Sequence, residues 1–135
     1  MNPTDREIRQ ILETARTIAI VGLSDKPERD SHQVAAYLQA HGYRVIPVNP
    51  MVSEILGEKS YPSVSSIPEQ IDVVDVFRKP DAVMEIVEDA IQAGASAVWL
   101  QLGVVNLEAA GRAAEAGLQV VLDRCMKIEH KRLLG

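Results

Sequence analysis

Apolar and polar positions along the chain follow two patterns that alternate from one end to the other. Runs that are almost wholly apolar or β-branched are typical of strands buried on both faces of a sheet, and they occupy residues 17–22, 43–48, 72–77, 96–103 and 118–123. Segments with apolar residues at helical spacing predict helices at residues 30–42, 80–94 and 106–117. We expect two further helices: one that begins with a capping box of Thr4 and Glu7, and a short one after Asp123.

Polar residues, glycine and proline mark the boundaries of these elements. Asp30 or Ser31 can cap the second helix, and Gly42 ends it. Pro47 cannot donate a hydrogen bond to a neighbouring strand, so pairing should end near it. Residues 49–70 are the longest irregular segment, with room for only short helical turns.

The alternation of strands and helices predicts an α/β fold with a parallel sheet, helices on both faces and right-handed crossovers. We expect one domain over residues 1–135: a Rossmann-like, doubly wound, five-stranded sheet with strand order 3-2-1-4-5. Ligands of such sheets bind outside the carboxyl ends of the strands, where the order reverses. The loops that matter therefore begin near Gly22, Val48, Phe77, Gln101 and Asp123.

Composition and charge narrow the class of ligand. The net charge of −5 argues against non-specific binding to nucleic acid or anionic membranes. No apolar run approaches the roughly 20 residues that span a bilayer, and residues 1–10 do not resemble a signal peptide. A single cysteine, Cys125, and three dispersed histidines predict neither a disulfide nor a metal site. We expect a cytoplasmic protein whose partner is a small molecule.

The loop after the first strand is a candidate phosphate site. Gly22 permits a tight turn, and the next helix offers free N–H groups and a partial positive charge to an anion. Leu23 and Ser24 follow the glycine, with a hydroxyl on Ser24 to donate, and Lys26 and Arg29 can supply charge. The second and third glycines of a dinucleotide-binding turn are missing, however. A plain solvated connection also fits this loop.

The loop after the second strand disfavours NAD. An NAD site commonly places Asp or Glu there for the ribose hydroxyls, whereas this chain has Val48, Asn49 and Pro50. Asn49 tolerates a phosphorylated ribose better than a carboxylate would. A simple Asn-Pro turn is equally consistent with these residues.

The loop after the third strand places two cations at the start of a helix. Arg78 and Lys79 stand beside the positive end of the helix dipole, at a cost of roughly 0.3–1 kcal/mol each that an anionic ligand would offset. Phe77 could flank an adenine or a pantetheine arm. Against this, Phe77 could be core and Lys79 could point into solvent.

Six segments in order resemble one known family. "AIVGLSDKPERDSHQVAAYL", "GYRVIPVNP", "EILGEKSYPS", "VDVFRKP", "AVWLQLGVVN" and "DRCMKIEH" together resemble the small coenzyme A-binding-domain proteins of bacteria and archaea, which are related to the nucleotide-binding domain of the succinyl-CoA synthetase alpha subunit. The resemblance implies CoA as the ligand. It implies that Gly22 to Lys26 meet the phosphates, that residues 48–50 line the adenosine side, and that residues 77–80 and the segment Leu100-Gln101-Leu102 border the ligand further along.

The chain departs from the synthetase pattern in two ways. The lysine that follows the V-x-P element in the synthetase is absent, so Lys26, Arg29 or Arg78 would have to meet the 3′-phosphate. The phosphorylated histidine of the synthetase lies in a second domain that this chain does not contain. The resemblance therefore implies binding and not the ligase reaction.

No complete catalytic constellation is visible in the sequence. Cys125 stands between Arg124 and Lys127, where cations promote thiol reactivity, but a buried packing role is favoured because no base or oxyanion site accompanies it. We expect a CoA- or acyl-CoA-binding module with no catalytic residue, acting alone, as a homo-oligomer or beside a partner enzyme. The alternatives are an acyl-CoA transferase or ligase component that uses Cys125, and an NAD(P)-binding regulatory domain.

Overall fold

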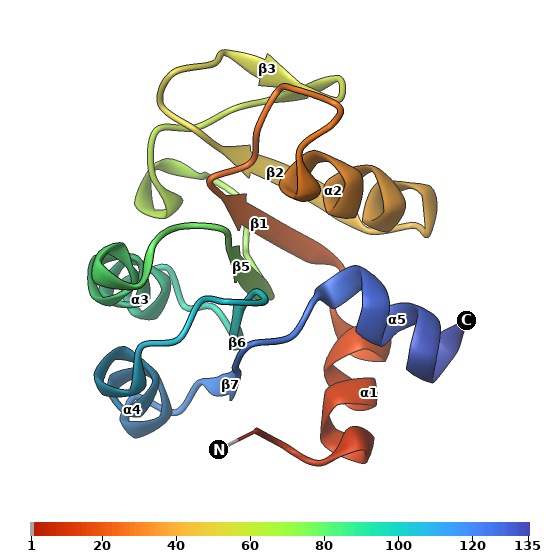
Figure 1. Cartoon of the computed structure of the whole chain (residues 1–135). Helices are drawn as coiled ribbons and strands as arrows, with labels where there is room; N and C mark the ends of the chain where they lie inside the picture. The colour runs from red at the N-terminus through yellow and green to blue at the C-terminus, as the bar shows by residue number, and fades with distance from the viewer. Residues whose placement is uncertain (1) are drawn as a thin grey trace.

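The computed structural model describes residues 2–135 and confirms an α/β fold with a parallel sheet flanked by helices (Figure 1). The five parallel strands, in chain order, are β1 (Thr17–Val21), β2 (Arg44–Val48), β5 (Val73–Val76), β6 (Ala97–Leu100) and β7 (Gln119–Val121). Five helices pack on this sheet: α1 (Asp5–Thr14), α2 (Asp30–Ala40), α3 (Val83–Gln92), α4 (Leu107–Glu115) and α5 (Met126–Leu134).

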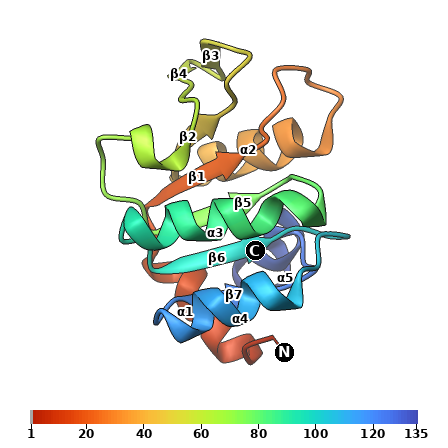
Figure 2. The same cartoon turned by 90° about the vertical axis from the view of Figure 1, so that its left-hand side faces the viewer.

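The helices divide between the two faces of the sheet. Helices α3 and α4 cover one face, which is turned toward the viewer in Figure 2, and α1, α2 and α5 cover the other. Successive strand side chains point to opposite faces: Ile18 and Ile20 pack with α1, α2 and α5, whereas Ala19 and Val21 pack with α3 and α4. Because both faces are buried, the strands are mainly apolar, and Asp75 of β5 is a fully buried exception.

The predicted strand order is wrong. The sheet runs β2-β1-β5-β6-β7, which is 2-1-3-4-5 when the strands are numbered along the chain, instead of 3-2-1-4-5. The third strand, β5, pairs with β1 and not with β2. The order therefore reverses between β1 and β5, as in the flavodoxin-like version of the doubly wound fold.

The segment after β2 returns to the outer edge of that strand. Tyr61 pairs in parallel with β2: its N–H donates to Pro47 O at 3.0 Å and its carbonyl accepts from Asn49 N at 2.9 Å. The outer edge of β2 is therefore paired at its carboxyl end, and β5 lies on the other side of β1. Pro47 fits because its missing N–H lies on this outer edge, and pairing with β1 continues one residue further, to Val48.

The irregular segment contains a small hairpin that the sequence pattern did not predict. Strands β3 (Glu54–Ile55) and β4 (Glu58–Lys59) pair antiparallel, and a 3₁₀ turn, η1 (Val64–Ser66), follows. Leu56 and Gly57 connect the strands with φ values of 53° and 77°. Two positive φ values identify the type I′ turn that suits the twist of a two-residue hairpin.

Helix boundaries follow the predicted signals with one exception. Thr4 and Glu7 form the expected capping box of α1, and a 3₁₀ turn, η2 (Pro80–Ala82), precedes α3. The exception is α2, whose N-cap residue is Arg29 and not Asp30 or Ser31. No side chain caps this helix, which leaves its first N–H groups available to a ligand.

Residues 2–135 contain neither a candidate membrane-spanning helix nor a candidate metal site. No helix there has both the length and the apolar character needed to cross a bilayer. No group of three or more His, Cys, Asp or Glu side chains is arranged to hold a metal ion.

Candidate functional site

The strand ends of β1 and β5 lie against each other where the sheet order reverses. Gly22 has a φ of 85°, and a Cβ at this position would lie 2.5 Å from Phe77 O and 3.0 Å from Arg78 Cδ. Gly22 N donates to Val48 O at 3.0 Å, and Phe77 N donates to Val21 O at 2.9 Å. Only glycine fits this close approach, and the absence of a side chain opens the space above it.

The loop that follows Gly22 is held by side chains from two other elements. Ser24 N donates to Ser31 Oγ at 3.0 Å, and Ser24 O lies 2.9 Å from His32 Nδ1; both partners belong to the first turn of α2. From the end of β2, Asn49 Nδ2 donates to Leu23 O at 2.9 Å. The backbone at residues 22–24 is therefore fixed in place before any ligand arrives.

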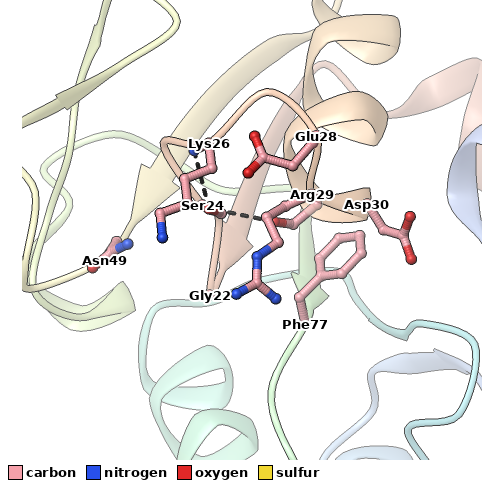
Figure 3. A pocket seen from close by; sticks show the side chains of 9 residues that line it. Gly22, Ser24, Lys26, Glu28, Arg29, Asp30, Asn49 and Phe77 are labelled. Atoms are coloured by element: carbon pink, nitrogen blue, oxygen red, sulfur yellow. Dashed lines mark hydrogen bonds between the residues drawn. The ribbon is translucent and has the colours of Figure 1, made fainter.

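The first cleft lies above this loop and has a volume of about 620 Å³ (Figure 3). It is lined by Gly22, Ser24, Lys26, Glu28, Arg29, Asp30, Ser31, Asn49 and Phe77. Figure 3 shows the Arg29 side chain extending over the turn at Gly22, beside the Phe77 ring. Ser24 Oγ accepts from Lys26 N at 3.1 Å, so its own proton remains free to be donated.

The electrostatics of the first cleft favour an anion. The uncapped N-terminus of α2 opens into it, with the partial positive charge of the helix dipole. Four cations lie at or next to the cleft: Lys26, Arg29, Arg78 and Lys79. None of them takes part in an ion pair within the described part of the chain. Glu28 and Asp30 reduce the positive potential but do not pair with these cations.

A second cleft of about 610 Å³ adjoins the first, because Asp30 and Phe77 line both. Its wall is built from α2, the strand ends of β5 and β6, and the start of α5. The remaining lining residues are Gln33, Val34, Arg78, Lys79, Pro80, Gln101, Leu102, Gly103, Val104, Cys125, Lys127 and Ile128. The two clefts form one groove that is mainly polar at the β2 end and partly apolar at the β6 end.

A buried carboxyl lies beneath this second cleft. Asp75, in the middle of β5, is fully buried, and Gln101 Nε2 donates to its Oδ1 at 2.7 Å. Its Oδ2 has no partner within residues 2–135. Burial raises the pKa of Asp75 to about 7, against the opposing effect of hydrogen bonds from Gln101 and Val76 N–H. The sequence signal for this buried carboxyl is an acidic residue inside an otherwise apolar strand, because burying an unpaired charge is costly.

Residues 16–131 match the model of the CoA binding domain family. The chain belongs to this family.

Relatives of this CoA-binding domain protein fall into two groups. Small proteins match over nearly their full length: Bacillus subtilis YneT is 42% identical over 96% of both chains, and a Pyrococcus horikoshii protein of known structure is 55% identical, with a TM-score of 0.96 over 98% of this chain and 94% of the other. An ADP-forming acetate–CoA ligase of Archaeoglobus fulgidus is 27% identical over 58% of this chain, which is 12% of the ligase. The fold thus occurs both alone and inside a larger enzyme.

The structure brings together nine of the twelve residues expected to bind the ligand. Gly22, Ser24, Lys26, Arg29, Asn49, Phe77, Arg78, Lys79 and Gln101 line the two clefts. Leu23 is fully buried in the core, Val48 is buried and lines a different cleft on the α3 side, and Pro50 is exposed and lines neither. These three residues are therefore not among those that line the two clefts.

Sequence reasoning did not assign to the site the residues of α2 and α5 that line the clefts. Ser31 and Val34 come from α2, and Lys127 and Ile128 come from α5. The sequence signal for them is weak, because the approach of these two helices depends on how both pack on the sheet.

Cys125 lines the second cleft. It is the N-cap residue of α5, and its side chain makes no capping hydrogen bond. His130, the nearest histidine in sequence, instead shares a 2.8 Å hydrogen bond with the Tyr37 hydroxyl. Within the described residues no hydrogen bond joins a base to the Cys125 thiol.

Proposed function

We propose that this protein binds coenzyme A or an acyl-CoA along the two adjoining clefts, as a ligand-binding module without a complete active site of its own. The observation that carries the proposal is the groove itself. Unpaired cations and an uncapped helix N-terminus meet at the point where the sheet order reverses, and a longer, less polar cleft continues from there. Membership of the CoA binding domain family supports the same ligand.

The pyrophosphate fits the first cleft. Gly22 leaves its backbone open to close approach, and the N-terminus of α2 points N–H groups and a partial positive charge at the same space. The Ser24 hydroxyl can donate a further hydrogen bond. Lys26, Arg29 or Arg78 would supply the charge that the missing lysine of the synthetase pattern supplies to the 3′-phosphate.

Asn49 shapes the part of the first cleft that would hold the adenosine. Its side-chain amide donates to Leu23 O, and its carbonyl oxygen accepts from Met51 N at 2.9 Å. Both bonds fix the edge of the first cleft. The side chain is therefore a clamp on the loop, in contrast to the carboxylate that recognises ribose hydroxyls in an NAD site.

The pantetheine arm fits the second cleft. Its two amides need hydrogen-bond partners, and Gln101 can supply one from the floor of the cleft, where Asp75 holds it in position. Val34, Phe77 and Val104 can pack against the carbon atoms of the arm. The terminal thiol would lie on the side of the groove lined by Cys125.

Isothermal titration of ligand-stripped protein tests the proposal. CoA should bind more tightly than dephospho-CoA or ADP, because each charge-assisted contact contributes roughly 1.5–3 kcal/mol. NAD should bind weakly or not at all. Tighter binding of NAD than of CoA, or no binding of any of the four ligands, would overturn the proposal.

A further inference from the structure

The second cleft has an apolar rim that coenzyme A alone does not require. Leu102, in the loop after β6, is 58% exposed, and Ile128, in α5, is 52% exposed. Single exposed apolar residues are ordinary on a protein surface. These two come from separate elements, 26 positions apart, and both line the same cleft.

The apolar surface continues from the rim into the cleft. Val34 and Val104 are buried beneath it, and Phe77 and Cys125 are partly buried in the same wall. Contact between an apolar wall and water is unfavourable, and a ligand that covers the wall removes this cost. An aliphatic group bound there would remove both its own surface and that of Leu102 and Ile128 from water.

The position of this surface identifies the occupant. The first cleft holds the cations and the helix N-terminus, so it fixes the polar end of a bound ligand, and Phe77 connects it to the second cleft. A CoA molecule that follows the groove from the first cleft directs its thiol end into the second. The group attached to that thiol would then meet the rim formed by Leu102 and Ile128.

We propose that the Leu102–Ile128 rim binds the aliphatic chain of an acyl-CoA thioester, so that the physiological ligand carries an acyl group of several carbons rather than a free thiol or an acetyl group. This proposal rests on the proposed CoA function. It adds a ligand class and two specificity-determining residues. No bond is made or broken in the binding step.

A series of thioesters tests the proposal on the full chain. Dissociation constants would be measured by isothermal titration for CoA, acetyl-CoA, butyryl-CoA, hexanoyl-CoA and octanoyl-CoA. Affinity should rise by about two- to fourfold per methylene along the series, since a fully buried methylene contributes roughly 0.8 kcal/mol. The heat-capacity change of binding should become more negative with chain length.

Matched variants locate the effect. Leu102→Gln and Ile128→Gln should each reduce the preference for octanoyl-CoA over CoA at least threefold. Leu107→Gln is the control, because Leu107 is 68% exposed, is close in sequence to Leu102 and does not line the cleft. All three positions are exposed, so these variants should fold normally.

The outcomes separate this proposal from the function on which it rests. If CoA binds but octanoyl-CoA binds no tighter than acetyl-CoA, the acyl site is wrong and the CoA site stands. If neither binds, both are wrong. An equal loss of octanoyl-CoA affinity in Leu107→Gln would identify non-specific adsorption. A homodimer that dissociates in the Leu102→Gln and Ile128→Gln double variant would assign the rim to a second copy of the chain. This result and the equal loss in Leu107→Gln would each overturn the acyl site.

Discussion

The side-chain amide of Gln101 donates a 2.7 Å hydrogen bond to the carboxyl group of Asp75, which is completely buried beneath the second cleft. One residue of the pair lines the proposed ligand site, and the other titrates near neutral pH, because burial raises the pKa of Asp75 to about 7. The pair therefore connects the geometry of the site to the protonation state of the core.

Asp75 should make the protein less stable as the pH rises from about 4 to about 7. In this window the unfolded chain has lost the proton, since an unperturbed Asp has a pKa of about 3.9, but the folded chain still holds it. Stability therefore falls with rising pH and levels off above about 7, with a total loss on the order of 4 kcal/mol. Below pH 4 both states are protonated and the effect disappears.

Asp75→Asn should remove most of this dependence, because the amide cannot ionise and can still accept the hydrogen bond from Gln101. Urea unfolding at pH 5, 6, 7 and 8 measures it. Asp25→Asn, at an exposed position, is the control and should keep the wild-type slope. An unchanged slope in Asp75→Asn would mean that Asp75 is ionised in the folded protein throughout this range.

Gly22→Ala should destabilise the fold by about 1–3 kcal/mol from backbone strain, with a further loss from the clash with Phe77 O. Gly42→Ala is a matched control, since Gly42 has a similar φ of 93° but a Cβ added there would have no atom within 4 Å. The difference in free energy of unfolding between the two variants reports the close approach of the β1 and β5 ends. Equal losses in both would show that the backbone there relaxes without cost.

Arg29→Ala should weaken CoA binding by about tenfold to hundredfold, the range expected for the loss of a charge-assisted contact. Arg78→Ala tests the cation whose side chain lies next to Gly22. Whichever residue meets the 3′-phosphate should, when removed, abolish the preference for CoA over dephospho-CoA. Arg6→Ala is the control for net charge, because Arg6 is an exposed residue of α1 that lines neither cleft. An equal loss of CoA affinity in Arg6→Ala would mean that the loss in Arg29→Ala comes from long-range electrostatics and not from a direct contact.

His130 should make the protein less stable as the pH falls below about 6.5. Burial, and secondarily the neighbouring His41, lower the pKa of His130, so the unfolded chain binds a proton that the folded chain does not. This trend opposes that of Asp75 over part of the same range. His130→Gln should therefore be least destabilising at acidic pH, in urea unfolding at pH 5 and 8. A constant difference at the two pH values would show that His130 titrates normally.

Removing the Tyr37 hydroxyl with Tyr37→Phe separates packing from hydrogen bonding in this region. Tyr37 and His130 share a 2.8 Å hydrogen bond between α2 and α5, so its loss should cost about 1 kcal/mol at pH 8. The ring contacts of Tyr37 with His41 would remain. No change in the free energy of unfolding would mean that solvent replaces this bond.

Much of the local structure of this protein could be predicted from the sequence. Residues 17–22 and 72–77 are apolar runs because their strands are buried on both faces, and Thr4 caps α1 because its spacing to Glu7 suits a capping box. The loop at Gly22 was recognisable because a strand, a glycine and a helix start follow one another there. These features depend on residues that are neighbours in the chain.

The strand order and half of the groove depended on contacts between distant residues. Tyr61 pairs with the outer edge of β2, and β5 pairs with the other side of β1, which brings Phe77 and Arg78 against Gly22. Likewise, α5 packs beside α2 and places Ile128 in the same cleft as Leu102. The sequence by itself determined the five strands of the main sheet, the five helices and the turn at Gly22, because propensity and periodicity act locally. The tertiary structure decided which strand ends meet and what lines the far end of the groove, because edge pairing and helix packing depend on the whole chain.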